Sequence, residues 1–273
     1  MVLFSNCKIN LGLNITEKRA DGYHNIETAF YPVQWHDAIE IIQAADSAVS
    51  PSFTATGLVI PGKKADNICL KAYMVLKKDF PKLPTIKMHL HKSVPVGAGL
   101  GGGSGNGAFT LQLINKKFNL GLSSEQLIDY AFQLGSDCPF FIVNQPCFAT
   151  SRGEKMEVIS LDLSGYSILI IHPGIHINTA LAFSKLEPQK PIKSIRDIIQ
   201  QPVETWKKEL VNDFEKTIFR EFPEIKTIKQ LLYNRGALYV SLSGSGSSIY
   251  GIFAKNDLPQ VNLRNNYLQK IIF

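Results

Sequence analysis

The sequence contains no long apolar run. No segment approaches the roughly 18 residues that a helix needs to cross a bilayer, and runs such as 140–143 and 168–171 have the length of buried strands. The first residues also lack a basic segment followed by an apolar stretch, so no signal peptide is predicted. These two absences predict a cytoplasmic protein that makes no contact with a membrane.

Cysteine is also scarce. Four cysteines occur, and no two of them form a C-x-x-C pair, which argues against a zinc ribbon and a thioredoxin motif. Few and scattered cysteines are typical of a reducing cytoplasm. The histidines predict no metal centre either, because His89 and His91 lack a third ligand nearby and a Pro-Gly pair separates His172 from His176.

A strong excess of positive charge is absent as well. The formal net charge is +6, from 29 Lys and Arg against 23 Asp and Glu, and no run of five basic residues occurs. This charge favours anionic substrates, whereas nucleic-acid binding is not expected without a basic run or a basic helix. We predict a small-molecule substrate, no nucleic-acid partner, and a monomer or weak homodimer.

The composition that is present is that of an ordinary globular protein, with 45% hydrophobic residues over a length of 273. Residues 4–15 alternate between apolar and polar types, which predicts a half-buried strand, and Asn67 begins a pattern typical of a capped helix. Strands and helices then follow without strict alternation, so the fold class is predicted as α+β. We expect two domains, residues 1–155 and 156–273.

Residues 97–107 form the most unusual segment, because seven of these eleven positions are glycine. Glycine costs about 0.5–1 kcal/mol relative to alanine inside regular structure, so such a run needs a reason. A strand predicted at 86–90 precedes the loop, and a helix beginning near 104–108 follows it. Close approach of the backbone to an anion explains the glycines, because successive N–H groups and a helix N-terminus bind phosphate. The alternative is a flexible hinge.

Two better-known phosphate loops do not fit this segment. A Walker A loop requires G-x-x-x-x-G-K-[ST], and no lysine follows these glycines. Residues 97–102 match G-x-G-x-x-G, but glycine density alone produces that match. The acidic residue expected at the end of the next strand is missing, since Glu125 lies at a predicted helix start. A nicotinamide-dinucleotide site is therefore not favoured.

Several motifs resemble the GHMP kinase superfamily, which includes galactokinase, homoserine kinase and mevalonate kinase. The segment from Pro95 to Gly101 is similar to its ATP loop, P-x-x-x-G-L-G, and 242–247 is similar to its third motif. Three further segments resemble one branch of the superfamily, whose substrate is a cytidine diphosphate sugar alcohol. They are K-I-N-L-G-L with R-A-D-G-Y-H in 8–24, G-S-D-C-P-F-F in 135–141 and N-D-F-E in 212–215.

The resemblance spans nearly the whole chain and implies a two-lobed GHMP kinase fold. Its N-terminal lobe is expected to be ribosomal-protein-S5-domain-2-like and its C-terminal lobe ferredoxin-like. It also implies ATP and Mg²⁺ as cofactors. The implied reaction is phosphorylation of the 2-hydroxyl of 4-diphosphocytidyl-2-C-methyl-D-erythritol, a step of non-mevalonate isoprenoid synthesis.

The resemblance further implies a catalytic pair. Asp137 is expected to accept the proton of the substrate hydroxyl, and Lys8 to keep that carboxylate ionised and offset developing charge. From the residues alone, two alternatives stay open. Asp137 just before Cys138-Pro139 also suits the cap of a helix. Lys8 and Asn10 also suit a solvated strand face.

The remaining predicted contacts come from the same resemblance. The residues expected to contact ATP are Asn67, Lys92 and those of the glycine loop. Within that loop the predicted residues are Pro95, Val96, Gly97, Ala98, Gly99, Leu100, Gly101, Gly102, Gly103, Ser104 and Gly105. The residues expected to contact the substrate are Asn10, Tyr23, His24, Thr179 and Phe183. Of these, Tyr23 and His24 would hold the cytosine, and Phe183 is by sequence alone more typical of a core residue.

The loop departs from the superfamily pattern G-G-G-S-S-N-A-A at Gly105 and Gly107. Each glycine is expected to weaken the first helical turn by up to about 1 kcal/mol, which predicts mobility there before ATP binds. Two other functions stay open: a kinase for another small alcohol, such as homoserine or a mevalonate derivative, and a non-catalytic nucleotide sensor. The presence of Lys8 and Asp137 argues against a sensor, because a binding module needs no proton acceptor.

Overall fold

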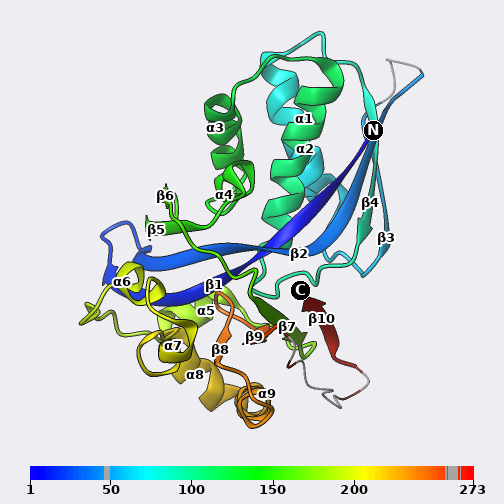
Figure 1. Ribbon diagram of the computed structural model, residues 1–273. Helices are drawn as coiled ribbons and strands as arrows, with labels where there is room; N and C mark the ends of the chain where they lie inside the picture. The colour runs from blue at the N-terminus through cyan, green and yellow to red at the C-terminus, as the bar shows by residue number, and fades with distance from the viewer. Residues whose placement is uncertain (46–49, 256, 258–263, 265) are drawn as a thin grey trace. The chain divides into compact units, whose positions relative to one another are not determined.

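The computed structural model describes residues 1–45, 50–255, 257, 264 and 266–273. The chain forms two compact units, and each is built from separated segments. The segments of the first unit are 1–7, 34–96 and 101–145; those of the second are 8–33, 97–100 and 146–273. Two long paired strands, β1 (Val2–Lys18) and β2 (His24–Gln43), contribute residues to both units (Figure 1). The predicted domain limits of 1–155 and 156–273 stay a prediction.

The first unit pairs β2 with β4 and β4 with β3, and its helices precede and follow the glycine loop. Strand β4 runs antiparallel to β2 and parallel to β3. The elements that lie wholly in the first unit are β3 (Ser52–Gly57), a 3₁₀ turn (Lys64–Asp66), α1 (Ile68–Asp79), β4 (Ile86–Lys92), α2 (Gly102–Phe118), α3 (Ser124–Leu134) and α4 (Cys138–Val143). The predicted cap of α1 is confirmed, because the Asn67 side chain accepts a hydrogen bond from the Cys69 N–H. A capping box of Ser123 and Gln126 begins α3.

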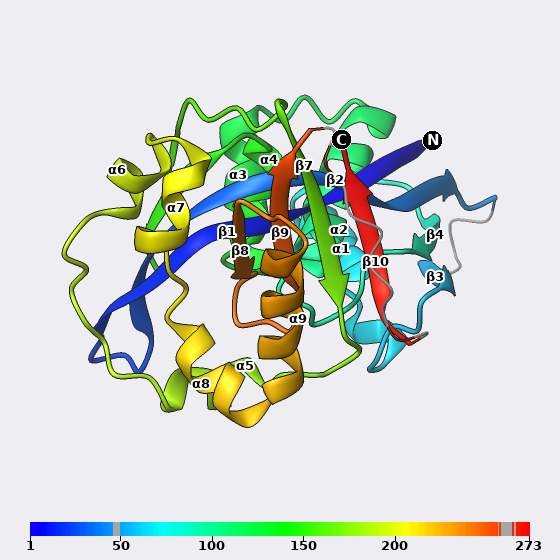
Figure 2. The ribbon, with the colours of Figure 1, turned by 60° about the horizontal axis from the view of Figure 1, so that its bottom comes forward.

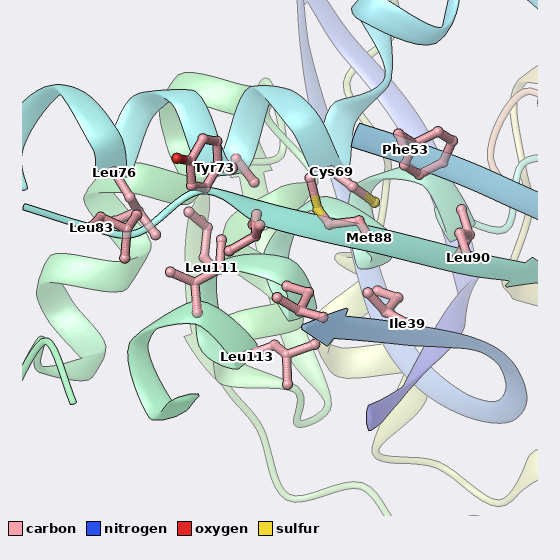
Figure 3. Packing of buried hydrophobic residues seen from close by; sticks show 14 of the residues in the cluster. Ile39, Phe53, Cys69, Tyr73, Leu76, Leu83, Met88, Leu90, Leu111 and Leu113 are labelled. Carbon is pink, nitrogen blue, oxygen red and sulfur yellow. The ribbon is translucent and has the colours of Figure 1, made fainter. Parts of the chain in front are cut away.

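The core of the first unit lies between these helices and strands. Apolar positions at helical spacing on α1 and α2 meet the alternating apolar positions of β2 and β4 (Figure 3). Tyr73 and Leu111 are examples from the helices, and Ile39, Met88 and Leu90 are examples from the strands. All five side chains are almost completely buried, so this core fixes both elements that flank the glycine loop.

The second unit contains a four-stranded antiparallel sheet in the order β10-β7-β9-β8. In the same unit, β5 pairs with both β2 and β6. The strands are β5 (Cys147–Ser151), β6 (Lys155–Val158), β7 (Tyr166–His172), β8 (Tyr239–Leu242), β9 (Ile249–Ala254) and β10 (Leu268–Ile272). The helices are α5 (Thr179–Ser184), α6 (Ile195–Ile199), α7 (Val203–Glu209), α8 (Phe214–Glu221) and α9 (Pro223–Asn234). Helix α9 packs on β8 and β9, as Figure 2 shows.

Both units combine helices with mainly antiparallel strands, which confirms the predicted α+β class. In the part of the chain that the structure describes, no helix is both long enough and apolar enough to span a bilayer.

Helix α2 begins at Gly102, slightly earlier than the predicted 104–108, and its glycines have a packing role that the sequence did not predict. A Cβ atom on Gly105 would lie 2.8 Å from the Asn6 carbonyl oxygen, and one on Gly107 would lie 2.9 Å from Cγ1 of Ile68. Both residues are buried, so glycine lets α2 approach β1 and α1 closely. The predicted mobility of this helical turn before ATP binds stays a prediction.

Substitution can separate two effects of glycine in α2: the close packing that it permits and the helix propensity that it lowers. Gly105→Ala is expected to lower the free energy of unfolding by about 1–3 kcal/mol, because backbone has to move to make room for the methyl group. Gly103→Ala is the matched control, because nothing lies within 4 Å of a Cβ at that position. It should leave stability unchanged or raise it by up to about 1 kcal/mol, because alanine favours a helix. Urea denaturation without nucleotide measures both, and equal effects would contradict the packing role.

Candidate active site

The glycine loop alternates in backbone handedness. Gly97, Gly99 and Gly101 have φ values of 67°, 78° and 66°, in the left-handed region that favours glycine. Ala98 and Leu100 lie between them and are buried. Alternation of this kind turns successive N–H groups toward one side, which produces an anion-binding concavity. The loop therefore has a backbone conformation typical of anion-binding loops, and its binding of ATP phosphates stays a prediction.

The third motif, residues 242–247, lies behind the part of this loop that belongs to the second unit. The Ser243 hydroxyl donates a hydrogen bond to the Gly99 carbonyl at 2.8 Å, and the Ser248 N–H donates to the Ala98 carbonyl at 3.1 Å. A Cβ on Gly99 would lie 2.0 Å from the Ser243 carbonyl oxygen, so only glycine permits this approach. Ser243 of the motif and the adjoining Ser248 thus bind two successive carbonyls of the loop.

Lys8 is buried next to the same loop. Its ammonium group donates to Asn10 Oδ1 at 2.6 Å and to the Gly99 carbonyl at 3.3 Å, and it lies 5.0 Å from the centre of the Phe30 ring. Its backbone N–H donates to the Leu100 carbonyl at 2.9 Å. Lys8 is 4% exposed and Asn10 is 1% exposed, so the alternative of a solvated strand face is wrong. A buried ammonium held by polar groups places positive charge beside the loop.

Asp137 belongs to the first unit and occupies the residue before α4. Pro139 lies in the first turn of that helix, as predicted, but the Asp137 side chain makes no capping hydrogen bond to it. The carboxylate is therefore not used as a helix cap. Burial raises the pKa of the neighbouring Cys138 thiol to about 12, with Ser104 as its hydrogen-bonding partner. Cys138 is thus a neutral core residue at physiological pH and not a nucleophile.

Aromatic rings gather in the second unit among the predicted substrate residues. The His24 and Phe183 rings stack with centroids 5.2 Å apart and planes at 21°, and Phe183 also packs edge-on against Phe214. Tyr23 is 55% exposed, and the Arg152 guanidinium lies 4.2 Å from the centre of its ring. Phe183 is therefore partly a core residue, as its sequence context suggested, and also presents its ring to His24.

Three other predicted residues have protein partners. The Thr179 hydroxyl lies 3.0 Å from the Ser245 hydroxyl, in the third motif. The Asn67 side chain caps α1, and the Lys92 ammonium forms a buried ion pair with Asp37. The predicted contacts of Asn67 and Lys92 with ATP stay a prediction, and both side chains have a structural role.

Sequence reasoning missed Asp37, Asn106 and Arg152. A signal for Asp37 is present, because in the predicted strand it shares the alternating positions of Trp35, Ile39 and Ile41, where a charge is costly to bury. Asn106 lies inside the glycine-rich segment, whose composition indicates a role for the backbone and gives no sign of a buried side-chain role. Nothing in the sequence pairs Arg152 with Tyr23, since the two are far apart along the chain.

Comparison with known proteins assigns the family. Residues 67–145 match the model of the GHMP kinases N terminal domain, and residues 194–266 match the GHMP kinases C terminal model. Curated proteins named 4-diphosphocytidyl-2-C-methyl-D-erythritol kinase are 49% identical in Bacteroides thetaiotaomicron and 47% identical in Bacteroides fragilis strain YCH46. These alignments cover 97% of both chains in the first case, and 94% of this chain and 93% of the relative in the second.

The chain belongs to the 4-diphosphocytidyl-2-C-methyl-D-erythritol kinase family of GHMP kinases. A crystal structure of 4-(cytidine 5'-diphospho)-2C-methyl-D-erythritol kinase agrees with it in fold, with a TM-score of 0.80 at 26% identity. That match covers 94% of this chain and 91% of the other. The resemblance inferred from the motifs, and with it the GHMP kinase fold, is confirmed.

A buried histidine in this GHMP kinase predicts a pH dependence of stability. The His172 ring lies 3.3 Å from the Ser247 hydroxyl, beside the third motif, and burial lowers its pKa below the usual value of about 6.5. The unfolded chain therefore binds a proton at a higher pH than the folded chain does. Stability from this group is fully present above about pH 6.5 and is lost as the pH falls through the lower, folded-state pKa.

Urea denaturation at pH 7 and at pH 5.5 measures this effect. His172→Asn is expected to reduce the loss of unfolding free energy on acidification relative to the wild type. The matched control is His91→Asn, which replaces an exposed histidine of β4. If His172→Asn and the wild type lose the same stability, burial of His172 has no part in the pH dependence.

Proposed function

We propose that the chain transfers the γ-phosphoryl group of ATP to the 2-hydroxyl of 4-diphosphocytidyl-2-C-methyl-D-erythritol, in the non-mevalonate route to isoprenoid precursors. The names of its relatives, at 47–49% identity over nearly the full length, support this substrate. The observation that carries the proposal is the buried Lys8 ammonium bound to the Gly99 carbonyl of the glycine loop. Phosphoryl transfer requires positive charge at an anion-binding loop, and this contact provides it.

The loop from Pro95 to Gly105 would hold the ATP phosphates. Alternating left-handed glycines direct amide groups to one side, and the N-terminus of α2 adds unpaired donors and a positive dipole end. The described residues contain no group of three or more His, Cys, Asp or Glu that would hold a metal. Mg²⁺ usually binds through substrate phosphates, water and one or two carboxylates. When bound, Mg²⁺ would neutralise phosphate charge.

Asp137 would accept the proton of the attacking hydroxyl. As the oxygen–phosphorus bond forms, the bond between the γ-phosphorus and the bridging oxygen breaks, ADP leaves, and the hydroxyl proton passes to the carboxylate. Lys8 would offset the negative charge that develops during transfer.

The aromatic group in the second unit would bind the cytosine. Burial lowers the pKa of His24, and Lys18 adds to this effect, so its ring is neutral at pH 7 with one donor and one acceptor nitrogen. Such a ring can hydrogen-bond the edge of a base, and the exposed Tyr23 ring offers a face for stacking. Phe183 would extend the aromatic surface, while Asn10 and Thr179 would contact the polar part of the substrate.

The cellular setting is part of the same proposal. We infer a cytoplasmic enzyme that acts as a monomer or weak homodimer and has no nucleic-acid partner. All four cysteines, which lie within the described residues, are buried and form no disulfide, as is usual in a reducing compartment.

Replacement of Asp137 tests the proton acceptor directly. Asp137→Asn keeps the shape of the side chain but removes the base, so kcat in an ADP-release assay should fall roughly 10²- to 10⁴-fold. Binding of ADP should stay unchanged, because the loop is intact. Asp129→Asn, at an exposed position of α3, is the matched control and should keep wild-type turnover. Near-wild-type turnover by Asp137→Asn would contradict the role of Asp137 as the proton acceptor.

A further inference from the structure

A buried polar network in the first unit has no part in the proposed chemistry. It consists of Asp37 on β2, Lys92 at the end of β4, and Asn106 on α2. The Lys92 ammonium forms an ion pair with Asp37 Oδ2 and donates to Asn106 Oδ1 at 3.2 Å. The Asn106 amide donates to Asp37 Oδ2 at 2.9 Å. Each of the three residues is at most 2% exposed.

Such a network is costly to build. An ammonium and a carboxylate removed from water lose their hydration, and an apolar pair of similar size often gives equal or greater stability. Here the penalty is offset because every polar group is bound: Asp37 accepts four hydrogen bonds, and the Asn106 amide lies 3.4 Å from the Ser5 hydroxyl. Stability alone does not explain the choice of charged residues at this place.

The position of the network explains why charged residues are used there. Asp37 Oδ1 accepts hydrogen bonds from the N–H groups of Ser93 and Val94, at 2.7 and 2.8 Å. These two residues directly precede the glycine loop, and Asn106 lies in the second turn of the helix that follows it. One carboxylate therefore binds the chain on both sides of the loop.

A further contact brings the same two segments together. A Cβ on Gly102, the first residue of α2, would lie 2.9 Å from Cγ1 of Val94 and 3.2 Å from the Lys92 ammonium nitrogen. Glycine at this position permits the helix start to lie directly against the residues that enter the loop. The distance between the two ends of the loop is thus set by packing and by hydrogen bonds together.

We propose that Asp37, Lys92 and Asn106 are positioning residues that fix the two ends of the glycine loop and so determine its affinity for the nucleotide. This inference rests on the proposed function, because it requires that the loop bind ATP. The physical reason is preorganisation: a loop whose ends are fixed loses less conformational entropy when a ligand orders it. Asp37 and Asn106 act on nucleotide binding through the loop ends, and the Lys92 ammonium contributes through its ion pair with Asp37.

Two asparagines at opposite ends of α2 provide a matched test. Asn106 binds the network at the loop end, whereas Asn115 makes two hydrogen bonds with the backbone of Leu122 at the far end of the helix. Asn106→Ala and Asn115→Ala remove the same functional group from the same helix. The full-length proteins are compared by calorimetric titration with ADP, by KM for ATP and for the alcohol, and by thermal unfolding.

Asn106→Ala is expected to weaken ADP binding and raise KM for ATP about tenfold or more, because a displaced phosphate loop binds poorly. KM for the alcohol should stay at the wild-type value. Asn115→Ala should keep all three constants, although the melting temperature falls for both variants. If Asn106→Ala does not fold, Asn106→Ser keeps a polar group in the helix and gives the same comparison.

These measurements distinguish a failure of the positioning role from a failure of the proposed function. Unchanged ADP binding in a folded Asn106 variant would show that the network is only structural and would overturn the positioning role. Equal loss of ADP binding in the Asn106 and Asn115 variants would overturn it too, because the effect would then follow from general destabilisation. Wild-type protein that fails to bind ADP would instead overturn the proposed function itself.

Discussion

A loop that binds phosphate through its own backbone depends on how its carbonyl groups are bound. Each peptide carries a donor and an acceptor, and the donors can be directed at a ligand only if the acceptors are satisfied elsewhere. In this chain the carbonyls of Ala98, Gly99 and Leu100 accept from Ser248, Ser243 and Lys8. The amide side of the loop is thereby available to an anion. The glycine run, the third motif and Lys8 are parts of one hydrogen-bonding arrangement.

Glycine serves two separate purposes in this segment. At 97, 99 and 101 the backbone takes left-handed φ values, which a residue with a side chain adopts only at a cost. At 105 and 107 the backbone is helical, and glycine is required because α2 packs closely against its neighbours. The density of glycine in this segment therefore combines a requirement for left-handed backbone at 97, 99 and 101 with a packing requirement at 105 and 107.

Much of the fold and part of the site follow from the sequence, and the reasons are local. Asn67 and the Ser123 capping box were predictable because a cap depends on residues within one turn. The glycine loop was predictable for the same reason. Local sequence also predicted mobility at Gly105 and Gly107, which stays a prediction, but it did not reveal the close approach of the Asn6 carbonyl to Gly105.

Contacts between distant segments were the part that sequence did not predict. Asp37 and Asn106 are separated by 69 positions and meet only because β2 and α2 pack in one core. The stacking of His24 on Phe183 likewise depends on tertiary structure. The sequence alone therefore indicated only an ordinary core residue at Phe183. Motif resemblance supplied the roles of Lys8 and Asp137, since no spacing within one element relates two residues so far apart in the chain.

This chain is a kinase of the 4-diphosphocytidyl-2-C-methyl-D-erythritol kinase family, which predicts a cytidine-containing alcohol as its substrate. The most direct measurement is an ADP-release assay in which 4-diphosphocytidyl-2-C-methyl-D-erythritol, homoserine and mevalonate are compared at equal concentration with ATP and Mg²⁺. We predict ADP release with the cytidine compound, inhibited by added cytidine nucleotides, and only background release with the other two. Comparable kcat/KM for homoserine or mevalonate, or no ADP release with any of the three, would contradict the account.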